Sequence, residues 1–175
     1  MSLALHGHHV LLIATLTFAT AVLTPNWYTS SDFQIKRNIF QICNTQTSCH
    51  WVLLPISNDT SVETIFPIIV ASLAIACAGI SLIGLLFGSW YIERFAGDIG
   101  SKWILILTIF CVFISFLLSC GVWSIMLTTN LHQNDTNIKY VRLENFDFSF
   151  WINIVASGCY LYSFFIYLIT ICRYC

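Results

Sequence analysis

The chain has 175 residues, of which 58% are hydrophobic and 9% are charged, and its mean hydropathy is +0.81. Soluble proteins carry about 25% charged residues, so this composition excludes an ordinary water-soluble domain and indicates an integral membrane protein. The net charge of −1 argues against a strongly basic surface, and we expect no nucleic acid among the partners.

The first hydrophobic run is predicted to span the membrane over residues 8–25. It reaches the length of about 20 residues that a span requires only when the preceding histidines are included. Ala19-Thr20-Ala21 resembles a signal-peptidase site, but no Lys or Arg precedes the run. His6, His8 and His9 are not spaced to share one helical face. We therefore expect them to form a solvated cluster at the membrane surface rather than a metal site.

Residues 26–64 form a long polar loop with the features of an extracellular segment. Cys43 and Cys49 are the only cysteines in polar sequence outside the last residues, and disulfides persist in oxidising compartments. Asn58 begins an N-glycosylation triplet. Strand-forming residues before Cys43 and turn formers between the cysteines predict a β-hairpin tied by one Cys43–Cys49 disulfide. Because so small a sheet is marginal alone, we expect the disulfide and the membrane-anchored ends to hold it.

Three further hydrophobic runs are predicted to span the membrane at residues 65–87, 103–127 and 148–172. The first of these three contains Gly84 and Gly88 in a GxxxG motif, which lets another backbone approach closely. Packing within the chain is the favoured interpretation, and a dimer face is the alternative. The polar stretch 89–101 is predicted to be a turn between antiparallel helices.

Four spans place both termini on one side of the membrane and the loops 26–64 and 128–147 on the other. Asn134 begins a second glycosylation triplet in the shorter loop, so both triplets and the polar cysteines fall on one side. Under the positive-inside rule, the distribution of Lys and Arg slightly favours the opposite orientation, but glycosylation and disulfides are chemically tied to the lumen. We expect a single-domain protein of the plasma membrane with cytoplasmic termini, and Cys172 and Cys175 are candidates for S-palmitoylation.

The predicted spans lack the residues that membrane chemistry uses. No span has Asp, Glu, Lys, Arg or His in its interior, which argues against a pump, a coupled transporter or an intramembrane protease. No phosphate-binding glycine loop, HExxH or GxSxG motif is present. The interior polar residues favour interhelical hydrogen bonds; they are Thr108, Ser115, Ser119, Asn153 and Ser157. We therefore expect no enzyme, no metal and no cofactor.

Residues of the long loop resemble the pattern of the claudin superfamily. Pro25-Asn26-Trp27, Asn38-Ile39-Phe40-Gln41-Ile42-Cys43 and Ser48-Cys49 are similar to its tryptophan, [Gly/Asn]-Leu-Trp-x-x-Cys and second cysteine. The order of long loop, inner turn and short loop matches over essentially the whole chain. The resemblance implies an all-α, left-handed four-helix transmembrane bundle that carries a small extracellular β-sheet. Trp27, Asn38 and Phe40 would belong to the sheet-stabilising motif together with Cys43 and Cys49.

The resemblance also implies a function in contact rather than in catalysis. The leading hypothesis is a protein that contacts other membrane proteins, at cell–cell junctions or in lateral assemblies. Ile39-Phe40 stand where the pattern has Leu-Trp, and the cysteines are closer together. These departures suit the alternative, an auxiliary gamma-like subunit that modulates gating or trafficking of an ion channel or receptor. A similar span pattern without an outer sheet, as in the MARVEL group, is favoured if the two cysteines are reduced.

Overall fold

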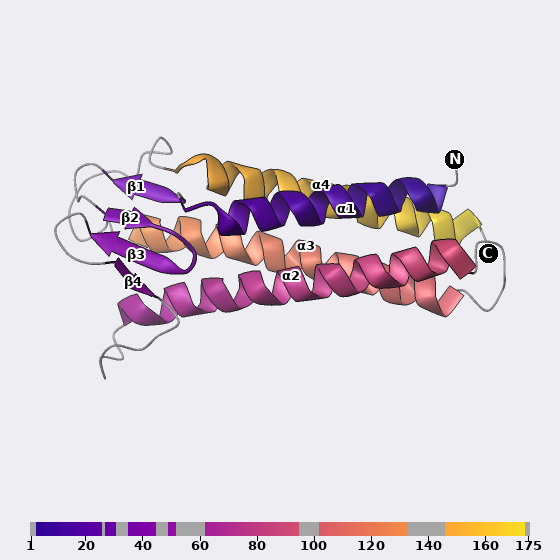
Figure 1. Cartoon of the computed structure of the whole chain (residues 1–175), viewed down its shortest axis with the longest axis horizontal. Coiled ribbons are helices and arrows are strands. Elements are labelled where there is room, and N and C mark those ends of the chain that lie inside the picture. The colour runs from indigo at the N-terminus through magenta and orange to yellow at the C-terminus, as the bar shows by residue number, and fades with distance from the viewer. Residues whose placement is uncertain are drawn as a thin grey trace.

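The computed structural model describes residues 3–25, 27–30, 35–44, 49–51, 62–94, 102–132 and 146–173. Four long helices lie side by side as a bundle, with short strands at one end and both chain ends at the other (Figure 1). They are α1 (Leu3–Leu23), α2 (Val62–Arg94), α3 (Lys102–His132) and α4 (Phe148–Arg173). Each is long and apolar enough to cross a membrane, which confirms the prediction of a multi-pass, four-helix membrane protein.

The helices are longer than the predicted spans. α2 continues to Arg94, so the prediction of a turn beginning at residue 89 is wrong for residues 89–94. Gly84, Gly88 and Tyr91 are all buried, at spacings of four and three that keep them on one helical face. The inner face of α2 therefore continues beyond the apolar run. α3 likewise continues to His132, past the predicted end at residue 127.

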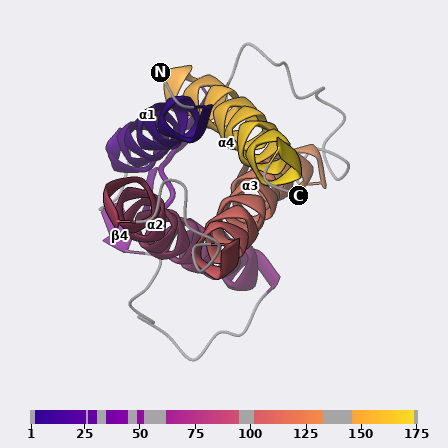
Figure 2. The same cartoon turned by 90° about the vertical axis from the view of Figure 1, so that its right-hand side faces the viewer.

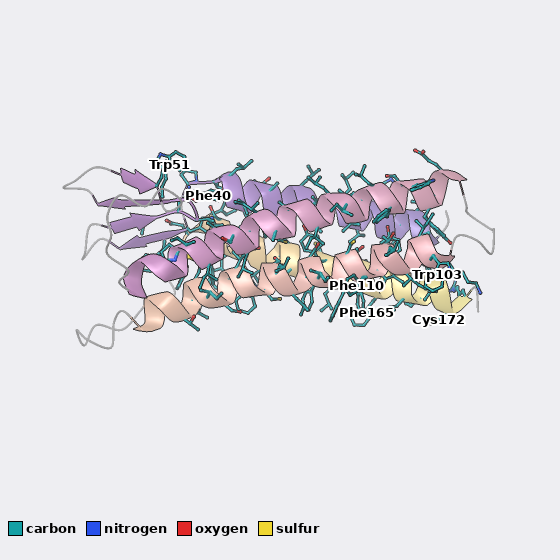
Figure 3. All side chains as sticks on the ribbon, turned by 90° about the horizontal axis from the view of Figure 1, so that it is seen from below. Phe40, Trp51, Trp103, Phe110, Phe165 and Cys172 are labelled. Carbon is teal, nitrogen blue, oxygen red and sulfur yellow. The ribbon has the colours of Figure 1, made fainter. Side chains whose placement is uncertain are left out.

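The four helices follow one another around the bundle in chain order (Figure 2). α1 packs mainly against α4 and α2 mainly against α3, whereas the interface between α1 and α2 is less extensive. Small side chains such as Ala14, Ala71 and Ala74 are fully buried where the helices meet, and small residues allow close backbone approach. Large apolar side chains, among them Phe110 and Phe165, project outward (Figure 3), as expected of a surface in contact with lipid.

Four short strands form an antiparallel sheet in the order β1-β2-β3-β4. Their bounds are β1 (Tyr28–Ser30), β2 (Ile35–Arg37), β3 (Gln41–Asn44) and β4 (Cys49–Trp51). Thr29 lies opposite Lys36, Lys36 opposite Cys43, and Cys43 opposite Cys49, so these four residues form one cross-strand row.

The turn between β2 and β3 depends on Asn38. Its backbone N–H donates to the Gln41 carbonyl at 2.8 Å, and its side-chain Oδ1 accepts from the Ile39 N–H at 2.5 Å. Asparagine is common in turns because its side chain bonds to nearby backbone in this way. Asn38 therefore sets the reversal that brings β3 back alongside β2.

Candidate functional site

The candidate site is the junction at which the sheet meets the bundle, and Trp27 lies at its centre. This side chain is 0% exposed, and its indole Nε1 donates to the Ala21 carbonyl at 2.8 Å. The backbone N–H that would normally reach Ala21 belongs to residue 25, which is proline and has none. Trp27 therefore supplies the missing donor at the end of α1 while it fills the space beneath the sheet.

Ile39 and Phe40 contribute apolar contacts at the same junction. Ile39 is buried in one cluster with Trp27 and Tyr28, and Phe40 packs against that cluster while it remains partly exposed. The sequence singled out Phe40 as the packing residue, whereas the structure buries its neighbour Ile39 more deeply. All three motif positions, Trp27, Asn38 and Phe40, thus lie in or beside the junction.

The start of α4 attaches to the outer edge of β1, a contact that sequence reasoning missed. Phe146 pairs with Tyr28 in an isolated antiparallel bridge, and their rings meet edge-on with centroids 5.4 Å apart. The Asp147 N–H donates to the Trp27 carbonyl at 3.2 Å, and Thr29 Oγ1 donates to Asp147 Oδ2 at 2.5 Å. These contacts fix β1 to both the first and the last helix.

The only local signal for this contact was Asp147 itself. It immediately precedes α4, and aspartate is favoured at the N-cap of a helix. That preference marks a helix start but does not reveal that the carboxylate is also a partner for Thr29.

Aromatic stacking continues the attachment along α4. The Phe146 and Phe150 rings lie 4.4 Å apart, and Phe150 meets Trp151 edge-on at 5.5 Å. Trp151 Nε1 donates to the Phe146 carbonyl at 3.3 Å. Aromatic pairs add about 0.5–1.5 kcal/mol beyond the area that they bury. The residues that lead into α4 are therefore held in place by aromatic contacts as well as by hydrogen bonds.

Cys43 and Cys49 lie directly opposite each other on β3 and β4. Opposed residues of antiparallel strands have Cα atoms about 4.5–5.5 Å apart, and a disulfide requires about 4.4–6.8 Å. The backbone of both cysteines is described, whereas their side chains lie outside the described part of the structure. Asn58, Asn134 and Cys175 also lie outside the described residues.

The two edges of the sheet differ. Within the described ranges, β1 is joined to Phe146 along its outer side, while β4 pairs with β3 alone. Trp51 ends β4 and is 54% exposed, and it lies with Phe40 at the sheet end of the molecule (Figure 3). A strand edge that pairs with no other described strand, beside an exposed tryptophan, is a surface on which another chain can add.

The other end of the molecule presents Trp103 and Cys172 (Figure 3). Trp103, at the start of α3, is 75% exposed, and Cys172 is an exposed free cysteine in the last turn of α4. Tryptophan is enriched where a membrane meets water. Trp103 and Cys172 are thus both exposed at the end of the bundle opposite the sheet.

The GxxxG glycines face the inside of the bundle. A Cβ on Gly84 would lie 3.2 Å from the Cys111 Cβ of α3, and one on Gly88 would lie 2.9 Å from His8 Nδ1 and 3.0 Å from the Tyr167 hydroxyl. Both glycines thus serve close packing within this chain.

The prediction that the three N-terminal histidines are solvated is wrong for one of them. His6 and His9 are exposed. His8 turns toward α2, where its Nε2 lies 3.2 Å from Ser89 Oγ and its Nδ1 is buried. The close approach that Gly88 allows explains why this histidine is accommodated between helices.

The chain matches no family model, and a search of curated proteins finds no match. In the part of the chain that the structure describes, no group of three or more His, Cys, Asp or Glu side chains could hold a metal ion. The likeness to the claudin pattern therefore rests on the residues quoted from the sequence.

Proposed function

We propose that this chain is a non-enzymatic, claudin-like protein of the plasma membrane that contacts other membrane proteins through its sheet. The contacts form at cell–cell junctions or in lateral assemblies with further copies or other chains. The observation that carries this proposal is the attachment of the sheet to two helices through Trp27, Tyr28 and Thr29. A surface held in place before binding loses little conformational entropy when a partner docks.

The β4 edge is the part of the sheet that we assign to the partner. The opposite edge is occupied by the start of α4, whereas Trp51 on β4 is exposed. Tryptophan is over-represented among residues that dominate binding energy at protein interfaces. A partner strand added along β4 would gain backbone hydrogen bonds and cover this side chain.

The proposal requires the sheet to lie outside the cell and the termini to lie in the cytoplasm. The opposed Cys43 and Cys49 support this orientation, because a disulfide there would form in the secretory pathway. The two glycosylation triplets, at Asn58 and Asn134, point the same way. We expect glycosidase treatment to lower the apparent mass of the wild-type protein on a gel by that of two glycans. Asn58→Gln and Asn134→Gln should each remove one of these glycans.

The disulfide is tested by alkylating intact cells before and after reduction. We expect the peptides that hold Cys43 and Cys49 to react with maleimide only after reduction, and Cys43→Ser to make Cys49 reactive at once. Free Cys77, which is buried in the bundle, serves as an unreactive internal control on intact cells. Labelling of both loop cysteines before reduction would show that the sheet holds no disulfide and would argue against the claudin pattern.

Contact formation is tested with Trp51→Ser and a matched change at the other end, Trp103→Ser. We expect the wild type and Trp103→Ser to gather at borders between two expressing cells, and Trp51→Ser to remain evenly distributed at equal surface level. Parallel purification in mild detergent distinguishes the alternative function. A stoichiometric channel or receptor with no border enrichment would identify an auxiliary subunit.

We also propose S-palmitoylation at the cytoplasmic end. Cys172 is exposed at the end of α4, and Cys175 follows shortly after it in sequence, as in other juxtamembrane acylation sites. Acyl exchange should detect label on the wild type and lose it in the Cys172→Ser, Cys175→Ser double variant. Cys159→Ser, within α4, should leave the label unchanged, and an unlabelled wild type would refute the modification.

A further inference from the structure

The lipid-facing surface of the bundle differs from helix to helix. The exposed large side chains of α1 are all aliphatic, whereas α3 and α4 expose phenylalanines. Phe110 of α3 is 59% exposed and Phe165 of α4 is 51% exposed, and both project from the same side of the bundle (Figure 3). Phe113 and Phe164 connect them, because the Phe164 ring lies 5.2 Å from that of Phe113 and 5.7 Å from that of Phe165. We call these four residues the aromatic face.

The aromatic face covers one leaflet of the membrane. Trp103, at the start of α3, is 75% exposed, and tryptophans are enriched at the level where a membrane meets water. An α-helix rises about 1.5 Å per residue, so Phe113 lies about 15 Å deeper than Trp103, about half of the hydrocarbon thickness of about 30 Å. Among the described side chains of α3, the exposed large ones end at Leu117. This depth matches one phospholipid, whereas a membrane-crossing helix of a partner would need an exposed face over both leaflets.

Two cations lie at the water-facing end of the same helices. Lys102 begins α3 and Arg173 ends α4, and these two helices pack against each other. Arg173 is exposed and Lys102 is half-buried, as expected where a lysine stem lies along apolar surface and its ammonium group reaches water. In the part of the chain that the structure describes, neither cation forms an ion pair. Both positive charges are therefore available to an anion.

The charge of this end indicates which lipid fits. A phosphate group accepts charge-assisted hydrogen bonds from both lysine and arginine. A headgroup with a net negative charge gains from both cations, whereas the choline of a zwitterionic lipid brings a further positive charge to the same place. α3 has no acidic residue in its first turn, and the acidic side chain described at this end, Glu93, belongs to α2.

We propose that the α3–α4 side of the bundle binds an anionic phospholipid, with its phosphate at Lys102 and Arg173 and an acyl chain along the aromatic face. In the orientation proposed above, this lipid belongs to the cytoplasmic leaflet, which is the leaflet that carries anionic lipids. The binding itself depends neither on that orientation nor on the function assigned to the sheet.

Photo-crosslinking from the aromatic face identifies what covers it. The full chain carries p-benzoylphenylalanine in place of Phe110, in bilayers with equal amounts of phosphatidylserine and phosphatidylcholine that have the same acyl chains. Mass spectrometry of the adducts then compares the two headgroups. We expect phosphatidylserine adducts to be at least about fivefold more abundant, because each Lys or Arg near the membrane surface strengthens binding of anionic lipid by about that factor. The same probe in place of Leu86, which is 70% exposed on α2, is the matched control and should capture both lipids nearly equally.

Charge variants separate a specific site from general attraction to the bilayer. Lys102→Gln and Arg173→Gln should each lower the preference for phosphatidylserine at residue 110, and the double variant should abolish it. Arg94→Gln, which removes one charge at the end of α2, should leave the preference unchanged. Equal capture of the two lipids at residue 110, or an equal preference at residue 86, would overturn the proposal. So would a preference lost in Arg94→Gln, or a crosslink from residue 110 to a second protein chain in place of lipid.

Discussion

Replacement of Trp27 by phenylalanine tests the account of how the sheet is attached to α1. The substitution keeps an aromatic ring but removes the indole N–H that donates to the Ala21 carbonyl at 2.8 Å. Pro25 cannot replace this donor because it has no backbone N–H. The carbonyl keeps only a longer contact from Thr24 Oγ1, at 3.4 Å.

The expected cost follows from burial. A buried group that loses its hydrogen-bond partner destabilises a protein by about 1–3 kcal/mol, so Trp27→Phe should lower the free energy of unfolding by that amount. Trp27→Ala also opens a cavity, because the side chain is 0% exposed. Replacing a buried tryptophan by alanine costs about 3–5 kcal/mol, so Trp27→Ala should destabilise the protein more than Trp27→Phe.

Equilibrium unfolding in mixed detergent micelles measures both values, with Trp103→Phe and Trp103→Ala as controls at an exposed tryptophan. Pro25→Ala provides a sharper check, because it restores a backbone N–H four residues after Ala21. Combined with Trp27→Phe, it should recover about 1 kcal/mol of the loss. A double variant no more stable than Trp27→Phe alone would show that the carbonyl is not the reason for the cost.

Three further outcomes are expected from the same unfolding measurement. Gly88→Ala should destabilise the protein by about 1–3 kcal/mol, because a Cβ at this position overpacks the bundle. Gly79→Ala, where an added Cβ meets nothing within 4 Å, should be neutral or stabilising. Equal effects of the two substitutions would contradict inward packing of Gly88. Thr29→Val and Asp147→Ala should show a coupling of about 1 kcal/mol in a double-mutant cycle, since their side chains are bonded and each substitution removes that bond, and additive effects would refute the attachment. Ser119→Ala, which loses bonds to two residues of α4, should cost about 0.6–2 kcal/mol, and no change would exclude that cluster as a stabilising contact.

Much of the architecture could be predicted from the sequence. Long apolar runs predict helices in a membrane because only a helix satisfies its own backbone hydrogen bonds in lipid. The helix ends were harder to predict, since α2 passes from lipid-compatible residues into Trp90-Tyr91-Ile92-Glu93 without a break. Hydropathy marks where a chain leaves the hydrocarbon layer, and a helix can continue beyond that point.

The site was only partly predictable. Trp27 and Asn38 were singled out by a local pattern, and each has a local role, at the end of α1 and in the β2–β3 turn. The contact between Thr29 and Asp147 joins residues 118 positions apart. No periodicity within either segment could indicate that pairing, because it depends on where the first and last helices bring their ends.

The amino-acid sequence by itself determined that this chain forms four membrane-crossing helices, because their length and apolar composition leave few alternatives in lipid. Only the tertiary structure decided which neighbour each helix face meets. Polar residues such as Asn153, Ser157 and Ser163 mark the inner face of α4, but a stripe on one helix does not show which other helices it contacts. Contacts such as His8 with Ser89, or Tyr160 near Thr15, follow from the packing of all four helices together.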